Sequence, residues 1–189
     1  MTLPPDLPVS TLSAGTKLWR IHRVGYDPVW FGPAPGQPPQ NRFDAPAGEF
    51  RVCYFGQDFE SAFVETLVRG RANRLIALAE LKERAASMVP LTREVRLARV
   101  HSDGLVHLAM PASVPHAAEY DECHQLALSL WRHADAVDGV EYRSRWDDSR
   151  LCVALFDRAA AALGGPITKA LGSTMPMRPV LRHYGIGVV

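Results

Sequence analysis

The alternation of hydrophobic and polar positions predicts the first two strands of the chain. In a strand over residues 17–23, Trp19 and Ile21 would lie on one face and Arg20 on the other. Residues 50–55 repeat this period of two, which predicts a second strand with alternating faces.

Four later segments also have the composition of strands. They are residues 75–81, 95–100, 140–144 and 151–156, and a polar linker separates the first two. The last of them is a continuous apolar run of strand length, which predicts a central strand buried on both faces.

Helical periodicity appears in two places. Asp58 can cap a helix in which apolar residues recur at helical spacing until Gly70. A longer helix is predicted over residues 117–136, and a short helical turn over residues 159–163. Strands and helices of this kind in one chain predict an α+β fold.

The remaining segments are expected to form an N-terminal tail, a long loop and an edge strand. Prolines 4, 5 and 8 predict a flexible N-terminal tail over residues 1–16. Residues 26–40 contain five prolines and two glycines, and loops of this length in compact domains are often functional. After a break at residues 164–166, residues 178–189 are expected to add an edge strand.

Composition narrows the class of protein. The chain has 189 residues, of which 47% are hydrophobic and 22% charged, as in one soluble globular domain. A net charge of +1 gives no reason to expect direct nucleic acid binding. No segment approaches the roughly 20 apolar residues of a membrane span. The N-terminus does not resemble a secretory signal, so a cytoplasmic location is expected.

Several common sites are missing from the sequence. Cys53, Cys123 and Cys152 form no C-x-x-C pair, so we expect three small buried hydrophobic side chains and no metal site. No Gly-rich dinucleotide motif, phosphate loop, compact histidine pattern or G-x-S-x-G elbow occurs.

Candidate chemistry comes from polar residues inside or beside the predicted elements, namely Arg20, Arg42, Tyr54, Glu65, Arg143 and Ser144. Taken singly, each is more often structural: a strand arginine pairs with a carboxylate, a helix-flank glutamate is solvated, and a terminal serine makes a turn. Their order along the chain is more informative than any one of them.

That order resembles the RES domain, a family named after an arginine, a glutamate and a serine. The motifs are LWRI at 18–21, NRF at 41–43, VCYF at 52–55 with Glu65 downstream, GVEYRSR at 139–145 and LFD at 155–157. The motif-bearing part is residues 17–157 of a single domain spanning residues 17–189.

The resemblance implies a fold, a reaction and a partner. RES proteins have an ADP-ribosyltransferase-like fold, with a split mixed or antiparallel β-sheet core flanked by helices. They are toxins of toxin–antitoxin pairs that deplete NAD⁺, and their partner is an Xre-type antitoxin. We expect that partner to cover the active-site cleft near the loop over residues 26–40. NAD⁺ would be a substrate, with no bound cofactor.

The resemblance also implies roles for individual residues. Arg42, Glu65 and Ser144 match the catalytic arginine, glutamate and serine. Arg20, Tyr54 and Arg143 are expected to line the NAD⁺ pocket. The reaction would cleave the nicotinamide–ribose bond, as a glycohydrolase if water is the acceptor or a phosphorylase if inorganic phosphate is the co-substrate.

These residue types suit that chemistry. An anionic glutamate can stabilise the oxocarbenium-like charge that develops on ribose. Arginine binds the oxygens of a pyrophosphate through a planar fork. A serine hydroxyl can orient the glutamate or the amide of nicotinamide, and a tyrosine ring can stack on nicotinamide.

Two other functions fit the same residues. One is an ADP-ribosyltransferase that modifies a protein or a nucleic acid, and the other is a non-catalytic binding module of the same fold. The sequence does not decide between water, phosphate and a macromolecule as acceptor.

Overall fold

The computed structural model describes residues 1–70, 73–172 and 177–189. Its strands are β1 (Val9–Leu12), β2 (Lys17–Arg23), β3 (Val52–Gly56), β4 (Leu75–Ile76), β5 (Arg84–Pro90), β6 (Val95–Val100), β7 (Gly139–Arg143), β8 (Leu151–Phe156), β9 (Ile167–Ala170) and β10 (Gly187–Val188). Its helices are α1 (Phe59–Phe63), the π-helix η1 (Val64–Val68), α2 (Leu78–Lys82), α3 (Asp103–His107), α4 (Ser113–His116), α5 (Asp121–Arg132), the 3₁₀ helix η2 (Asp157–Ala162) and α6 (Arg178–His183).

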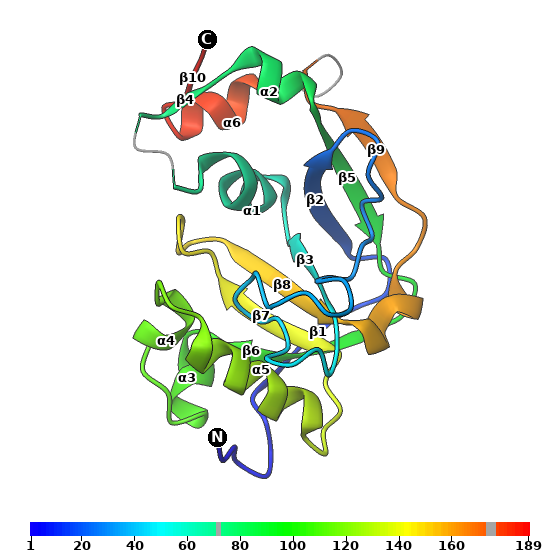
Figure 1. Ribbon diagram of the computed structural model, residues 1–189, viewed down its shortest axis with the longest axis vertical. Coiled ribbons are helices and arrows are strands. Elements are labelled where there is room, and N and C mark those ends of the chain that lie inside the picture. The colour runs from blue at the N-terminus through cyan, green and yellow to red at the C-terminus, as the bar shows by residue number, and fades with distance from the viewer. Residues whose placement is uncertain (71–72, 173–176) are drawn as a thin grey trace.

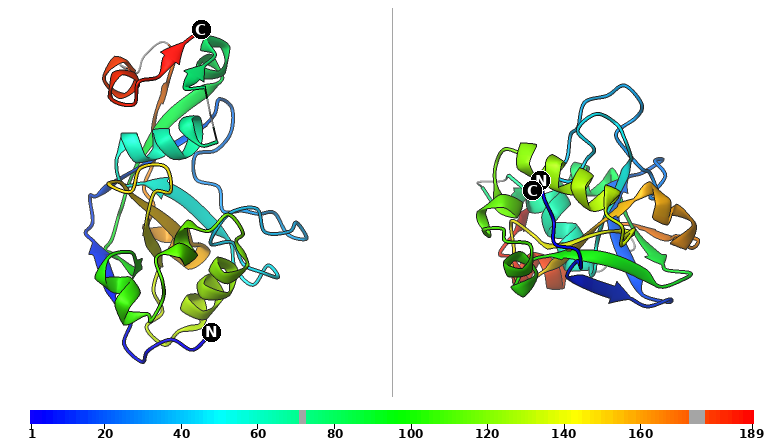
Figure 2. Two further views of the ribbon diagram at one scale, coloured as in Figure 1. Left: turned by 90° about the vertical axis from the view of Figure 1, so that its left-hand side faces the viewer. Right: turned by 90° about the horizontal axis from the view of Figure 1, so that it is seen from below.

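The described residues form an eight-stranded sheet in the order β1-β6-β7-β8-β3-β2-β5-β9 (Figure 1). Pairing within it is antiparallel except between β6 and β7, so the sheet is mixed. A smaller sheet pairs β10 with β4. Figure 2 shows the two termini at opposite ends of the long axis. The expected α+β domain with a mixed sheet and flanking helices is confirmed.

The large sheet is split between β3 and β2. These strands, both fully described, are paired only where Trp19 lies opposite Gly56, whereas β2 pairs with β5 along its whole length. Figure 1 shows α1 beside this opening, between the two halves of the sheet. The split therefore leaves a gap in which side chains from both halves can meet around one helix.

Helix α1 begins at the split for local reasons. Asp58 accepts a hydrogen bond from Ser61 N (2.7 Å), and Ser61 Oγ accepts one from Asp58 N (3.2 Å), which completes a capping box. The first turn packs on Gly56, where an added Cβ would come within 2.5 Å of Ala62 N. The predicted helix start at Asp58 is confirmed.

The core is built around β8. Cys152, Ala154 and Phe156 pack in the cluster on one face of the sheet, and Val153 and Leu155 pack in the cluster on the other. The expectation of a central strand buried on both faces is therefore confirmed. The strand predicted over residues 95–100 is β6, and the one over residues 17–23 is β2.

Several sequence-based expectations are wrong. Residues 75–81 hold only the two-residue β4 before α2 begins, because the Ala- and Leu-rich stretch favours helix. The supposed polar linker after it contains β5, which is paired on both sides by β2 and β9. Residues 178–189 form α6 and β10 instead of one edge strand.

Two further segments differ from the expectations. Residues 9–12, expected in a flexible tail, form β1 and pair with β6 from Val9 to Leu12. The long helix predicted over residues 117–136 is shorter and runs over Asp121–Arg132. The three cysteines are free and buried, as expected. Within the described ranges, no helix has both the length and the apolar character needed to cross a bilayer.

Candidate active site

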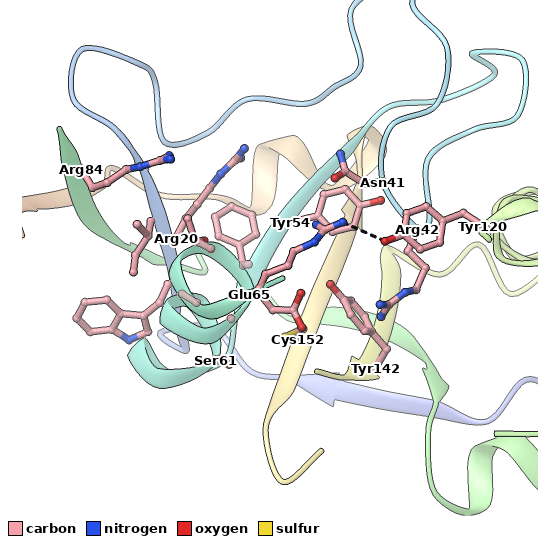
Figure 3. A pocket seen from close by; sticks show the side chains of 17 residues that line it. Arg20, Asn41, Arg42, Tyr54, Ser61, Glu65, Arg84, Tyr120, Tyr142 and Cys152 are labelled. Atoms are coloured by element: carbon pink, nitrogen blue, oxygen red, sulfur yellow. Dashed lines mark hydrogen bonds between the residues drawn. The ribbon is translucent and has the colours of Figure 1, made fainter. Parts of the chain in front are cut away.

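A cavity of about 400 Å³ lies at the split in the sheet, within the size range of small-molecule sites (Figure 3). Strands β2, β3, β5, β7 and β8 contribute to its lining, as do α1, η1 and the loop that holds Arg42. Residues at one-turn spacing along α1 and η1, and Arg69 directly after η1, face it; those on the helices are Ser61, Ala62, Glu65 and Thr66. The cavity thus joins both halves of the sheet to one face of one helix.

Glu65 enters this cavity from the π-helix η1 and is held by the loop after β7. Its Oε1 accepts a hydrogen bond of 2.6 Å from Ser144 Oγ and one of 3.2 Å from Arg145 N. Among the described residues, no hydrogen bond is donated to Glu65 Oε2. One oxygen is therefore fixed by the protein, and the other is available to a ligand.

The direction of the Ser144–Glu65 hydrogen bond follows from the surroundings of Ser144. Its Oγ accepts from Trp146 N (3.2 Å) and from Asp147 N (3.3 Å), so its lone pairs are occupied and its proton points to Glu65. Ser144 is fully buried but is not one of the residues found to line the cavity. Its contact with Glu65 makes it an orienting group.

Arg42 is 7% exposed and has unsatisfied nitrogen atoms. In the part of the chain that the structure describes, its buried Nε and Nη1 atoms have no hydrogen-bond partner. The guanidinium carbon lies 5.5 Å from the ring centre of Tyr142 and 5.8 Å from that of Tyr120. A buried guanidinium held by ring faces without a carboxylate partner is suited to an anionic ligand.

The loop before Arg42 is fixed by buried Asp44. Its Oδ2 accepts from the backbone N–H groups of Gln40 (2.9 Å) and Asn41 (2.7 Å), and its Oδ1 accepts from the hydroxyl of Tyr54 (2.8 Å). His124 donates to Asn41 O (3.0 Å). These contacts fix the backbone on which Arg42 stands.

Tyr54 lines the cavity, but its hydroxyl is directed at the Asn41–Asp44 turn. That hydroxyl donates to Asp44 and accepts from Phe43 N at 2.9 Å. Burial, with the charge of Asp44 next, raises the pKa of Tyr54 well above its ordinary value, so the hydroxyl remains a donor. The cavity thus receives the ring of Tyr54 and not its polar group.

Arg20 lines the cavity and also holds the long loop. Its Nη1 atom donates to Pro28 O and Trp30 O, both at 3.2 Å, and to Cys53 Sγ at 2.7 Å. Within the described residues these hydrogen bonds all use Nη1. The loop over residues 26–40 is thereby fastened to the rim of the cavity, and the other guanidinium nitrogens can still meet a ligand.

Arg143 does not take the position expected of it. Its guanidinium donates to Asp148 O (2.5 Å) and Ser102 Oγ (3.2 Å), and it is not among the described residues that line the cavity. Side chains alternate along a strand, so the neighbour that faces the cavity is Tyr142. The structure therefore does not bring Arg143 to the cavity with Arg20 and Tyr54.

Some cavity residues were missed by the sequence analysis. The polar ones among them are Asn41, Ser61, Thr66, Arg69, Arg84, Tyr120 and Tyr142. Arg69 follows Glu65 by four positions, a spacing that could have indicated it, and its Nη2 donates to Tyr120 Oη at 3.0 Å. Tyr120 reaches the site from the start of α5, and no local pattern indicates that approach.

The thiol and hydroxyl groups at the base of the cavity are neutral. Burial, with the negative charge of Glu65 next, raises the pKa of Cys152 above its ordinary value. Burial is also the first cause of the raised pKa of Tyr142, followed by Cys152 and Glu65. Glu65 is therefore the one acidic group among the described lining residues, against four arginines, so the cavity favours a ligand with net negative charge.

The described residues contain no group of three or more histidine, cysteine, aspartate or glutamate side chains that could hold a metal ion. The chemistry available at the cavity is thus that of one oriented carboxylate, several guanidinium groups and aromatic rings.

Two comparisons of the sequence with known proteins found similar proteins. The sequence model described as the RES domain matches residues 17–175. The chain is 32% identical, over 99 residues, to a protein of Sinorhizobium fredii (strain NBRC 101917 / NGR234) named "Probable toxin y4kH". That alignment covers 52% of this chain and 77% of the relative.

The fold also has a solved counterpart. A chain in the crystal structure of the M. tuberculosis MbcT–MbcA toxin–antitoxin complex superposes with a TM-score of 0.62 at 11% identity. The match covers 85% of this chain and 87% of that one. At this identity the likeness concerns the fold, and the fold class expected from the family resemblance is confirmed.

Proposed function

This chain belongs to the RES domain family, and we propose that it is an NAD⁺-consuming enzyme that cleaves the bond between nicotinamide and ribose. The main support is the pairing of Glu65 with Ser144 beside a buried arginine. One carboxylate oxygen is fixed at 2.6 Å from a serine hydroxyl, and Arg42 stands in the same cavity without a described hydrogen-bond partner at Nε or Nη1.

The substrate suits these groups. Nicotinamide leaves NAD⁺ as a neutral base that keeps the electron pair of the C–N bond, so no general acid is required. Positive charge then develops on the ribose, and the fixed carboxylate of Glu65 would stabilise it. Ser144 and the Arg145 N–H group orient that carboxylate before the reaction begins.

The arginines would bind the pyrophosphate. Arg42 offers buried N–H groups, and Arg20, Arg69 and Arg84 add positive charge along the lining. The rings of Tyr54 and Tyr142 provide aromatic surface for the nicotinamide. The acceptor oxygen, from water or from inorganic phosphate, would bond to the anomeric carbon. Water releases a proton in that step, and hydrogenphosphate need not.

We further propose that the protein acts as the toxin of a toxin–antitoxin pair. The similar protein of Sinorhizobium is named a probable toxin, and the similar structure is that of a toxin–antitoxin complex. An enzyme that depletes NAD⁺ in the cytoplasm harms its own cell unless a partner blocks it. An Xre-type antitoxin would cover the mouth of the cavity near the loop that Arg20 fastens.

Expression in bacteria without a partner tests this proposal. Wild-type protein should lower intracellular NAD⁺ before growth stops, and Glu65→Gln should do neither. Glu60→Gln is a matched control, because Glu60 lies on the adjoining helix α1 but does not line the cavity among the described residues. Normal growth and unchanged NAD⁺ at equal levels of folded wild-type protein would refute the proposal.

A further inference from the structure

Tyr184, the residue that follows α6, contacts both elements that bring Glu65 and Ser144 together. Its hydroxyl donates to Asp147 Oδ2 at 2.8 Å, three residues after Ser144. Its ring stacks on Phe63, two residues before Glu65, with 6.4 Å between ring centres and 11° between planes. One side chain thus joins the helix that holds the carboxylate to the loop that orients it.

The loop itself is closed and tied to the same helix. Ser144 N donates to Arg150 O at 2.9 Å, which brings the two ends of the loop together. Arg150 Nη1 then pairs with Asp58 Oδ2 at 2.7 Å, while Asp58 Oδ1 caps α1. Asp147 N donates to Ser144 Oγ, so a displacement of Asp147 would also change the position of the serine hydroxyl.

The polar half of the Tyr184 contact is a charge-assisted hydrogen bond. Burial raises the pKa of Asp147, but hydrogen bonds from Ser149 and Tyr184 outweigh it and keep that pKa below the usual value. Burial, with Asp147 next, raises the pKa of Tyr184 to about 12. The tyrosine is therefore the donor at neutral pH and the aspartate the charged acceptor.

We propose that Tyr184 is a positioning residue for the Glu65–Ser144 pair, and that it fixes the loop after β7 against α1 so that Ser144 donates to Glu65. The residue lies outside the cavity lining found among the described residues and beyond residues 17–175, which the family model matches. Tyr184, directly after the C-terminal helix, thereby helps to position Glu65 in this chain. The kinetic consequence rests on the proposed NAD⁺-cleaving function.

Tyr184→Phe tests the contact most selectively, because phenylalanine keeps the ring on Phe63 and removes only the hydroxyl. We expect kcat for NAD⁺ consumption to fall about tenfold while KM stays within about twofold, since the carboxylate is misplaced but the arginines are not. Arg182→Ala, an exposed change on α6, is the control and should leave kcat unchanged. A lower Tm with an unchanged kcat per folded molecule would overturn the proposal.

Amide hydrogen exchange gives a second readout that needs no turnover. In Tyr184→Phe, exchange at the N–H groups of Arg145 and Asp147 should accelerate, because these donate to Glu65 and Ser144. Val153, in the central strand β8, should be unaffected. If wild type consumes no NAD⁺, the proposed function fails but exchange still decides the positioning role. Unchanged exchange at Arg145 and Asp147 refutes it.

Discussion

The hydroxyl of Ser144 lies 2.6 Å from Glu65 Oε1, although 79 positions separate the two residues in the sequence. The bond is made across the junction of the loop after β7 and the π-helix η1, beside the split in the sheet. Two backbone N–H groups occupy the serine oxygen, so its proton is directed at the carboxylate. This contact fixes the one carboxylate among the described residues that line the cavity.

Replacing Glu65 by Gln should remove catalysis and spare the fold. The amide oxygen can still accept from Ser144 and Arg145, but the negative charge facing the ribose is lost. We expect kcat to fall by about 100-fold to 1,000-fold. Tm should stay within a few degrees. Rates from purified protein, with NAD⁺ binding measured by calorimetry, check this, and a variant that retains more than a tenth of wild-type kcat would contradict it.

Ser144→Ala should reduce both rate and stability. The substitution removes the part-buried hydrogen bonds from Trp146 N and Asp147 N and the charge-assisted one to Glu65, which together cost about 1–3 kcal/mol of unfolding free energy. Glu65 keeps only Arg145 N as a donor, so we expect kcat to fall by about ten- to 100-fold. Ser129→Ala, which removes an exposed hydrogen bond within α5, is the control for denaturant unfolding and for rate. Equal unfolding free energies and equal kcat values for Ser144→Ala and Ser129→Ala would show that Ser144 does not orient Glu65.

Arg42→Met should stabilise the protein while abolishing ligand binding. The buried guanidinium lacks a described carboxylate partner, and its two ring contacts are worth only about 0.5–1 kcal/mol each at exposed sites and about 2 when desolvated. An uncompensated buried charge costs several kcal/mol of folding free energy. Removing that cost should outweigh the loss of the ring contacts. We expect Tm to rise by at least about 2 °C.

Inorganic pyrophosphate provides the matched measurement for Arg42. It should raise the Tm of wild type in proportion to its binding and leave the Tm of Arg42→Met unchanged. A lower Tm for the variant, or an equal response of both proteins to pyrophosphate, would show that Arg42 is a structural residue.

Acid stability should depend on Asp138, away from the cavity. Burial raises the pKa of this residue, but hydrogen bonds from Arg93 and from Arg96 N outweigh it and hold the pKa below its ordinary value. A carboxyl whose pKa is lower in the folded state stabilises the fold above its unfolded pKa, and this contribution is lost as pH falls through the folded value.

Asp138→Asn should therefore flatten the fall in stability below about pH 4 that wild type shows. Denaturant midpoints measured between pH 2 and pH 7 check this, with the exposed Asp148→Asn as control. If the denaturant midpoints of wild type and Asp138→Asn fall equally steeply below about pH 4, this role for Asp138 is ruled out.

The fold was readable from the sequence where local pattern and tertiary packing agree. The run over residues 151–156 is apolar on both faces and became the central strand β8. Strand β5 was not predicted, because Ala85, Ala86 and Ser87 have a weak preference for strands. Long-range pairing with β2 and β9 stabilises their extended conformation. Helix α2 was missed because the strand predicted over residues 75–81 extended the two-residue β4 into it.

The site was predictable only in part. Arg42, Glu65 and Ser144 came from their order in the family motifs, and the structure brings Arg42 and Glu65 to one cavity with Ser144 beside it. Alternation along β7 could have excluded Arg143, because Tyr142 and Ser144 share the opposite face. The approaches of Tyr120 and Tyr184 depend on how α5 and α6 dock, and short-range sequence does not encode that docking.

Chromatography of the products that purified protein makes from NAD⁺, with and without inorganic phosphate, tests the proposed cleavage of the nicotinamide–ribose bond. We expect release of nicotinamide together with ADP-ribose, or with its phosphate ester when phosphate is present, and release at least about 100-fold slower from Glu65→Gln. Transfer of the ADP-ribose label to a protein or nucleic acid, with no free product, would contradict it in favour of a macromolecular acceptor. Intact NAD⁺ after incubation with folded wild-type protein would contradict it in favour of a binding module.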